Sequence, residues 1–331
     1  MTRTAPDTRA PVRRHHLPAG LALTLVVAGG ALSAGQSRIN AELGARVSSS
    51  LVAALISFGS GLVVVVALVL ARPAGRRALS RWGTYGLRWW QYLGGVGGAA
   101  FVFVAALTVP VLGVGLMTVA QVTGQIVGAL VADRLALSPS GRQPLTGPRL
   151  AGAGLGVLAV LVSATGHPSG QLALWALGLA VLAGFGMSLQ SAVNGRLNQA
   201  AGDPLVATAV NFTVGTTALA LGVAVTALTV GVHPSSLPGE WWLYLGGTAG
   251  VVFVTLNVVT VPVLGVLRLG LAAVAGQLAG ALVLDAVVPG GPGVSLPLGL
   301  GAVLTVVAFG VAGIRPRPRS ATLSRRGTTP R

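Results

Sequence analysis

The stretch Trp89-Trp90-Gln91-Tyr92-Leu93-Gly94-Gly95-Val96-Gly97-Gly98 returns later in the chain as Trp241-Trp242-Leu243-Tyr244-Leu245-Gly246-Gly247-Thr248-Ala249-Gly250. The offset is 152 residues, and at the same offset the hexapeptide at 109–114 repeats without change at 261–266. Repetition at one fixed spacing indicates that a single unit of about 150 residues is duplicated.

Two further motifs belong to the same duplication. Gly124, Gln125 and Asp133 recur as Gly276, Gln277 and Asp285, and, at an offset of 154 residues, Gln36 and Asn40 are matched by Gln190 and Asn194. What the duplication retains is therefore glutamine, glycine and a terminal aspartate.

The composition indicates an integral membrane protein with many spans. Only 8% of the residues are charged, 53% are hydrophobic, and the mean hydropathy is +0.80. A soluble domain of 331 residues needs more polar surface than this chain supplies. All 22 basic residues are arginine, so the lysine of a P-loop is lacking, and the chain has no cysteine for disulfides or thiol chemistry.

Ten apolar segments are long enough to cross a bilayer as helices, because irregular backbone is not tolerated in lipid. The predicted fold class is therefore all-α, with these spans at 18–40, 50–71, 89–109, 111–133, 149–166, 171–193, 204–230, 241–261, 263–285 and 294–314.

Arginine placement predicts the orientation. With ten spans, nineteen arginines fall on one side of the membrane, whereas Arg38 and Arg46 fall on the other and Arg268 lies just inside a span. The positive-inside rule then places both termini in the cytoplasm. This bias explains the net charge of +16 better than a nucleic-acid surface does, so no nucleic-acid partner is expected.

Each copy contains five spans, so the second copy must enter the membrane from the opposite side to the first. The architecture predicted is thus two inverted-topology five-helix repeats, a design used for alternating access. The expected domains are a disordered basic tail at 1–17, repeats at 18–166 and 167–315, and a second disordered basic tail at 316–331. Both tails are expected to contact lipid headgroups.

Polar residues inside the spans are the candidates for substrate contact, because each is costly in lipid. The alternative for any one of them is a hydrogen bond between neighbouring helices, and the Gly124-x-x-x-Gly128 and Gly276-x-x-x-Gly280 motifs are better explained by helix packing. Asp133 and Asp285 are candidates for ion coupling, with solvation near the membrane surface as the alternative. The substrate candidates are Gln36, Asn40, Ser57, Gln121, Gln125, Gln190, Asn194, Asn211, Asn257 and Gln277.

The series of motifs resembles the YdcZ-like family of the drug/metabolite transporter superfamily. The resemblance covers residues 18–315 and rests on Gln36 with Asn40, Ser57-Phe58-Gly59-x-Gly61, Trp89-Trp90-x-Tyr92-Leu93-Gly94-Gly95, and Gly124-Gln125 with Asp133, each with its second copy. It implies a ten-helix bundle of EamA type with a central cavity in a bacterial cytoplasmic membrane. The acidic residue that small multidrug-resistance relatives carry on their first helix has no equivalent here, where Gln36 is the nearest polar residue.

These observations predict a secondary transporter of a small polar metabolite or drug-like compound, working by alternating access without a cofactor or metal. Two alternatives stay open, a lipid-linked carrier or flippase using Arg268 and a membrane scaffold that transports nothing. Enzymatic activity is not expected, because no nucleophile–base pair or metal cluster can be assembled from the sequence. Membrane lipids are expected partners, and a homodimer is compatible with the sequence.

Overall fold

The computed structural model describes residues 18–137, 141–166, 173–230, 236–288 and 293–314, with the side chains of 230, 257, 258, 261, 262 and 265–267 left out. The tails predicted to be disordered lie outside these ranges. The described part contains helices and no strands. In chain order the helices are α1 (Ala19–Arg46), α2 (Ser50–Ala71), α3 (Pro73–Ser80), η1 (Trp82–Thr84), η2 (Trp89–Tyr92), α4 (Gly94–Arg134), α5 (Gly147–Thr165), α6 (Leu174–Ala201), α7 (Pro204–Val230), η3 (Trp241–Leu245), α8 (Gly246–Val287) and α9 (Leu296–Ala312).

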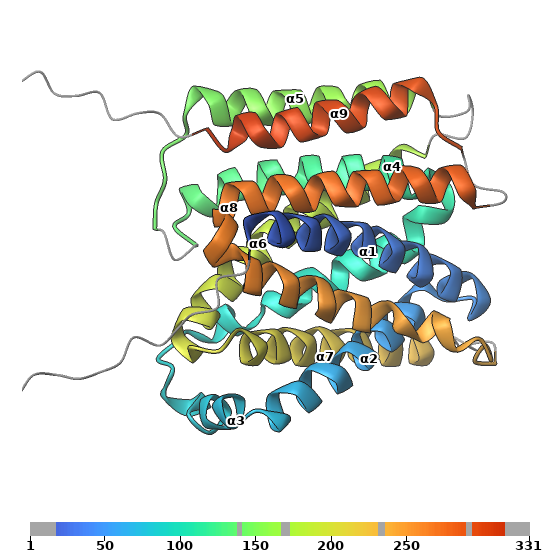
Figure 1. Ribbon diagram of the computed structural model, residues 1–331. Helices are drawn as coiled ribbons and strands as arrows, with labels where there is room; N and C mark the ends of the chain where they lie inside the picture. Colours follow the sequence, from blue (N-terminus) through green and yellow to red (C-terminus); the bar gives the residue numbers. More distant parts are fainter. Residues whose placement is uncertain (1–17, 138–140, 167–172, 231–235, 289–292, 315–331) are drawn as a thin grey trace, which may run out of the picture.

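The all-α membrane fold is confirmed. Among the described residues, seven helices are long and apolar enough to span a membrane. The ten predicted spans correspond to eight of the helices, because α4 and α8 each contain two of them. In Figure 1 both of these long elements fold back across the molecule at a sharp bend.

The bend in α4 falls at Gly113 and not at Pro110, where the link between two spans was predicted. Pro110 lies within the helix, whereas Gly113 has φ 76° and ψ 168°. Proline removes one backbone donor and weakens the helix, but its own φ remains helical. The reversal itself requires a positive φ, which glycine adopts without steric cost.

Two helices are longer than predicted. The span predicted at 18–40 corresponds to α1, which ends at Arg46. The span predicted at 171–193 corresponds to α6, which ends at Ala201. The apolar run ends earlier, but α1 continues because Glu42 pairs with Arg38 and Arg46 at i,i+4 spacing. Hydropathy locates the membrane-embedded part of a helix and misses its polar extension.

The two ends of the bundle differ in charge. We name one the α3 end, where α3 carries Arg76 and Arg77, and the other the Glu240 end, where the C-terminus of α1 meets Glu240. Figure 1 shows that α4 bends at the Glu240 end and α8 at the α3 end. The two repeats therefore run through the bundle in opposite directions, as predicted for an inverted duplication.

Helices pair across the repeats. The first-repeat helix α1 packs against α8, and α6 of the second repeat packs in the same way against α4; α2 lies on α7, and α5 on α9. Glycine makes the close crossings possible: a Cβ on Gly124 would lie 1.9 Å from the Val181 oxygen, and one on Gly276 2.1 Å from the Val27 oxygen. The two Gly-x-x-x-Gly motifs are packing grooves, which confirms that interpretation.

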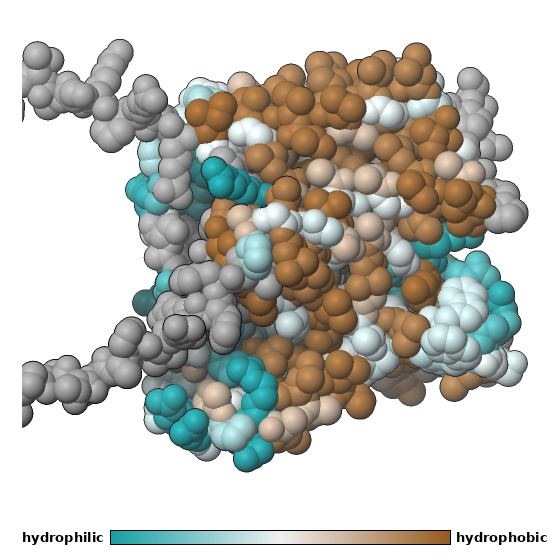
Figure 2. Space-filling model, viewed as in Figure 1, coloured by the Kyte–Doolittle hydropathy of each residue, from teal (hydrophilic) through white to brown (hydrophobic). Residues whose placement is uncertain are grey.

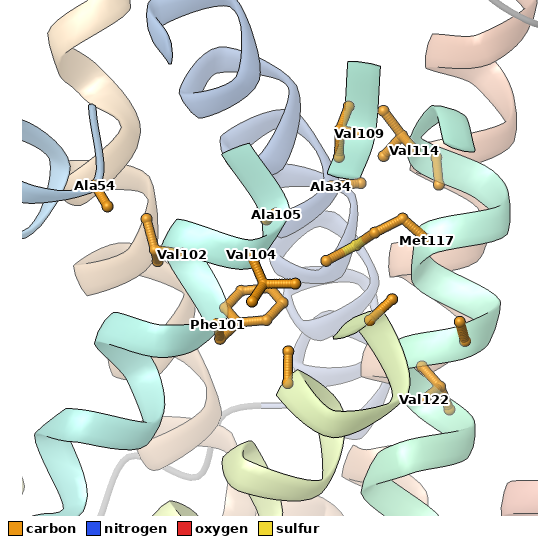
Figure 3. Packing of buried hydrophobic residues seen from close by; sticks show 14 of the residues in the cluster. Ala34, Ala54, Phe101, Val102, Val104, Ala105, Val109, Val114, Met117 and Val122 are labelled. Carbon is orange, nitrogen blue, oxygen red and sulfur yellow. The ribbon is translucent and has the colours of Figure 1, made fainter. Parts of the chain in front are cut away.

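The centre of the bundle is packed with apolar side chains. In Figure 3, Phe101 and Val104 from the first half of α4 face Met117 from its second half, next to Ala34 of α1. Met117 is fully buried and Ala34 nearly so. These four residues all belong to the first repeat, and the buried apolar cluster that contains them extends to second-repeat residues such as Ala180 and Val274.

Candidate substrate site

The first polar cluster lies between α1, α2 and the start of α8. We define it as Gln36, Asn40 and Ser57, which face Gly246 and Gly250. A Cβ on Gly246 would lie 2.3 Å from Asn40 Oδ1 and 2.9 Å from Ser57 Oγ. Asn40 is 1% exposed and Ser57 2%. Glycine at 246 is therefore required for the two polar groups to converge on the same helix.

The second polar cluster has the same geometry in the other repeat. It consists of Gln190, Asn194 and Asn211, which lie between α6, α7 and the start of α4. A Cβ on Gly94 would lie 2.3 Å from Asn194 Oδ1, matching the distance at Gly246. The internal symmetry thus extends from the backbone to the individual side-chain contacts.

The clusters differ in hydrogen bonding. In the second, Asn194 Nδ2 donates to Asn211 Oδ1 at 2.9 Å. In the first, Ser57 replaces the longer Asn211, and both Asn40 Oδ1 and Ser57 Oγ are buried without a hydrogen-bond partner among the described residues. In the second cluster, Gln190 Oε1 is likewise buried without a hydrogen-bond partner among the described residues. Buried polar atoms are nearly always paired in proteins, so these three oxygens are positions where a hydrogen-bonding solute would be stabilised.

An aromatic pair separates the two clusters. Phe58 follows Ser57 on α2 and Phe212 follows Asn211 on α7, and their ring centroids lie 5.0 Å apart at 34°. Each ring packs over a glycine of the opposite repeat, since a Cβ on Gly215 would meet Phe58 at 2.3 Å and one on Gly61 would meet Phe212 at 2.2 Å. The pair therefore sits where the pseudo-two-fold axis passes between α2 and α7.

The remaining predicted substrate residues lie apart from these clusters. Gln121 and Gln277 are buried on the second halves of α4 and α8, where their backbones make close crossings with Gly184 and Gly30. The Gln125 carbonyl accepts a hydrogen bond from Ser188 Oγ at 2.6 Å. Asn257 is on α8, and its side chain lies outside the described part. Substrate contact by any of these residues stays a prediction.

Asp285 is enclosed by protein, so solvation near the membrane surface does not explain it. Only 5% of the residue is exposed, and its Oδ1 and Oδ2 accept from the backbone N–H groups of Val114 at 2.9 Å and Gly115 at 2.7 Å. These are the first free donors of the second half of α4, just past the bend at Gly113. A carboxylate from the second repeat thus caps a helix of the first.

Asp133 occupies the equivalent position in the first repeat and forms an ion pair with Arg149 at the start of α5. The helix-terminal carboxylate therefore has a basic partner that offsets the unfavourable helix dipole. Coupling to an ion by Asp133 or Asp285 remains a prediction.

Two ion pairs between the repeats were missed from the sequence. Arg46 at the end of α1 pairs with Glu240 ahead of η3, and Arg72 at the end of α2 pairs with Asp203 at 3.4 Å ahead of α7. One lies at each end of the bundle. The sequence marks Asp203 and Glu240 only as loop residues, since no local signal relates them to arginines more than 100 positions away.

A family model described as "Putative inner membrane exporter, YdcZ" matches the chain twice, over residues 21–162 and 175–312. The chain belongs to the YdcZ family. The two matches fall on the two halves of the duplication, and membership identifies a transporter-type protein of the inner membrane within the drug/metabolite transporter group. The domain limits at 17, 166 and 315 stay predictions.

The YdcZ-family fold has a counterpart among solved structures. One crystal structure aligns over 89% of this chain and 96% of its own, with 18% sequence identity and a TM-score of 0.53. At this identity the similarity concerns the fold alone. A search of curated proteins gives no match.

Proposed function

We propose that this YdcZ-family protein moves a small, polar, uncharged or zwitterionic metabolite across the inner membrane by alternating access. The observation that carries the proposal is the pair of polar clusters related by the inverted repeat, one on each side of the Phe58–Phe212 contact. A solute that leaves one cluster meets similar polar side chains in the other. The protein can therefore bind the solute with the same kinds of group whether it is open to one side of the membrane or to the other.

The chemistry of the clusters favours a neutral solute. Their side chains are amides and one hydroxyl, which donate and accept hydrogen bonds without carrying charge. The unpaired amide oxygens of Asn40 and Gln190 are acceptors, whereas the Ser57 hydroxyl can donate or accept, so the solute must supply N–H or O–H donors to the amides. A permanent cation would lack a counter-charge here, since Asp285 is already engaged by two backbone donors.

Alternating access requires a barrier at each end that opens in turn. The Arg46–Glu240 pair would close the Glu240 end, and the Arg72–Asp203 pair would close the α3 end. With both pairs formed and the two phenylalanine rings in contact, the conformation corresponds to a closed intermediate between two open states.

The orientation is part of the proposal. We place the α3 end in the cytoplasm, because the arginines of 72–88 gather there and positively charged segments are retained on that side. The chain contains no cysteine, so Ser80→Cys would supply the only thiol for labelling. In intact cells an impermeant maleimide should fail to modify it and should succeed after permeabilisation; labelling in intact cells would reverse the orientation.

The transport proposal is tested in proteoliposomes with a panel of neutral and zwitterionic metabolites. Ser57→Asn rebuilds the amide pair seen in the second repeat, with Asn40 Nδ2 donating to the new Oδ1, and removes the unpaired Ser57 hydroxyl, so flux should fall at least tenfold while thermal stability holds or rises. Ser191→Asn is the matched control, because Ser191 is exposed on α6. No flux of any panel compound by folded protein would count against transport, whereas flux unchanged by Ser57→Asn would remove the first cluster from the site.

A further inference from the structure

An apolar crevice opens on the outside of the bundle near the α3 end. It lies between the end of α2, α3, η1 and the first turns of α7, none of its lining residues belongs to a polar cluster, and its volume is about 340 Å³. This falls within the range of small-molecule sites. Its walls include Val66, Leu70, Leu79, Trp82, Val210 and Val214.

The lining suits hydrocarbon. Thr213 is the one lining residue with a hydroxyl, and that group already donates to the Ala209 carbonyl at 2.8 Å. A polar solute placed here would lose its hydrogen bonds to water and gain none from the walls. A saturated chain loses nothing on entering and fills the space with dispersion contacts.

Arginines surround the mouth of this crevice. Arg76 donates to the carbonyl of Leu70 at 2.5 Å, which holds its guanidinium beside a lining residue while the side chain stays exposed. Arg81 lies between the lining residues Leu79 and Trp82, and is also exposed. The surface over α3 is hydrophilic and borders the hydrophobic surface of α2 (Figure 2).

The charge at this corner is not balanced by carboxylates. No Asp or Glu occurs between residues 43 and 132, and the nearby Asp203 is engaged by Arg72. Among the described residues, Arg76 and Arg81 have no carboxylate partner. The corner therefore attracts an anion, next to a crevice that accepts only a hydrocarbon chain.

Aromatic side chains mark the depth of the crevice mouth. The Trp82 ring lies 5.0 Å from that of Tyr92 and 6.1 Å from that of Tyr85. Tryptophan and tyrosine gather at the level of lipid headgroups. A chain in the crevice would thus leave its headgroup phosphate level with the guanidinium groups.

We infer that this crevice is a binding site for an anionic phospholipid, with one acyl chain between α2 and α7 and the phosphate on Arg76 and Arg81. The site does not depend on the transport proposal, because it shares no residue with the polar clusters. A zwitterionic phospholipid would fill the same crevice, but its cationic group would be repelled by the arginines. The observation specific to the anionic lipid is this juxtaposition of an apolar crevice and unbalanced arginines.

Native mass spectrometry of delipidated full-length protein tests the inference. The protein is mixed with phosphatidylglycerol or phosphatidylcholine of identical acyl chains, and retained lipid is counted. We expect phosphatidylglycerol to be retained at least fivefold better. The double substitution Arg76→Gln with Arg81→Gln should remove that preference. Each arginine is expected to contribute about fivefold to the ratio of retained phosphatidylglycerol to retained phosphatidylcholine. Arg142→Gln, an exposed arginine elsewhere in the described chain, should not.

The crevice is tested separately by filling it. Val210→Trp should displace both lipids, whereas Val225→Trp, at a 58% exposed position further along α7, should displace neither. Matched thermal unfolding shows that each variant is folded. Equal retention of the two lipids, or retention unaffected by Val210→Trp, would overturn the inference. So would a change from dimer to monomer on Val210→Trp, which would make the crevice an interface between copies.

Discussion

Phe58 and Phe212 occupy equivalent places in the two repeats and touch each other, with ring centroids 5.0 Å apart. Each ring replaces the missing side chain of a glycine on the helix opposite, Gly215 for Phe58 and Gly61 for Phe212. The contact lies between the two polar clusters, so its removal should affect passage between them more than it affects either cluster.

Phe58→Ala should join the two clusters. In the otherwise unsubstituted chain, the thiol of Gln36→Cys should be labelled only from the Glu240 end and that of Gln190→Cys only from the α3 end. With Phe58→Ala, each should become reachable from both ends, because the barrier loses half of its bulk. Phe309→Ala is the control, since that ring packs over Gly270 away from the axis. Labelling that stays one-sided would mean that another contact forms the barrier.

Gly247→Ala should prevent the close crossing of α8 over α2. The added Cβ would lie 1.8 Å from the Ser57 oxygen and 2.4 Å from the Gly61 nitrogen, and both are backbone atoms that cannot rotate away. Overpacking of this kind costs about 1–3 kcal/mol or more. Gly59→Ala, on the same α2 with open space around its Cβ, should be neutral. The measurement is unfolding in mixed detergent micelles; equal stability of the two variants would contradict the crossing.

Asp285→Asn should destabilise the second half of α4. The amide keeps one acceptor, so one of the two hydrogen bonds to Val114 and Gly115 is lost together with the charge. A hydrogen bond to a charged group contributes about 1.5–3 kcal/mol, and an unfolding free energy lower by about 2 kcal/mol is expected. Hydrogen exchange should rise locally at the first amides after Gly113. Exchange that increases evenly over the chain would show that the cap is not specific.

The two ion pairs between repeats should bias opening in opposite directions. Glu240→Gln weakens closure at the Glu240 end and should raise labelling of Gln36→Cys, whereas Arg72→Gln weakens the α3 end and should raise labelling of Gln190→Cys. The two variants serve as controls for each other. If both variants raised labelling of the same cysteine, the ion pairs would stabilise the protein in general and would not act as separate barriers.

The Arg46–Glu240 pair should resist acid. The pKa of Glu240 is lowered, first by a hydrogen bond from its own backbone, against partial desolvation, and then by the hydrogen bond and charge of Arg46. A lowered pKa means that its contribution to stability is present above the ordinary glutamate value of about 4.3 and is lost only below it. The difference in melting temperature between the native chain and Glu240→Gln should therefore stay constant from pH 7 to about pH 5 and vanish in stronger acid. A loss beginning near pH 6 would contradict this.

Much of the fold was predictable because its signals are local. Apolar runs located the helices, and the repeated Trp89 and Trp241 motifs with five spans per copy gave the inverted arrangement. The errors also have local causes. The extension of α1 to Arg46 contains charged side chains, which in a hydropathy profile mark the end of a span. The bend at Gly113 depends on the backbone angle of that glycine, which Pro110 does not determine.

The sequence by itself determined that two copies of a five-span unit cross the membrane in opposite directions, and that glutamine, asparagine and aspartate are retained within them. Only the tertiary structure decided which of these residues meet. It grouped Asn40 with Ser57, left their oxygens unpaired, turned Asp285 onto Val114 and Gly115, and brought Glu240 to Arg46. Helix formation follows from hydropathy within about 20 residues, whereas these contacts depend on the angle and depth at which glycine lets distant helices cross.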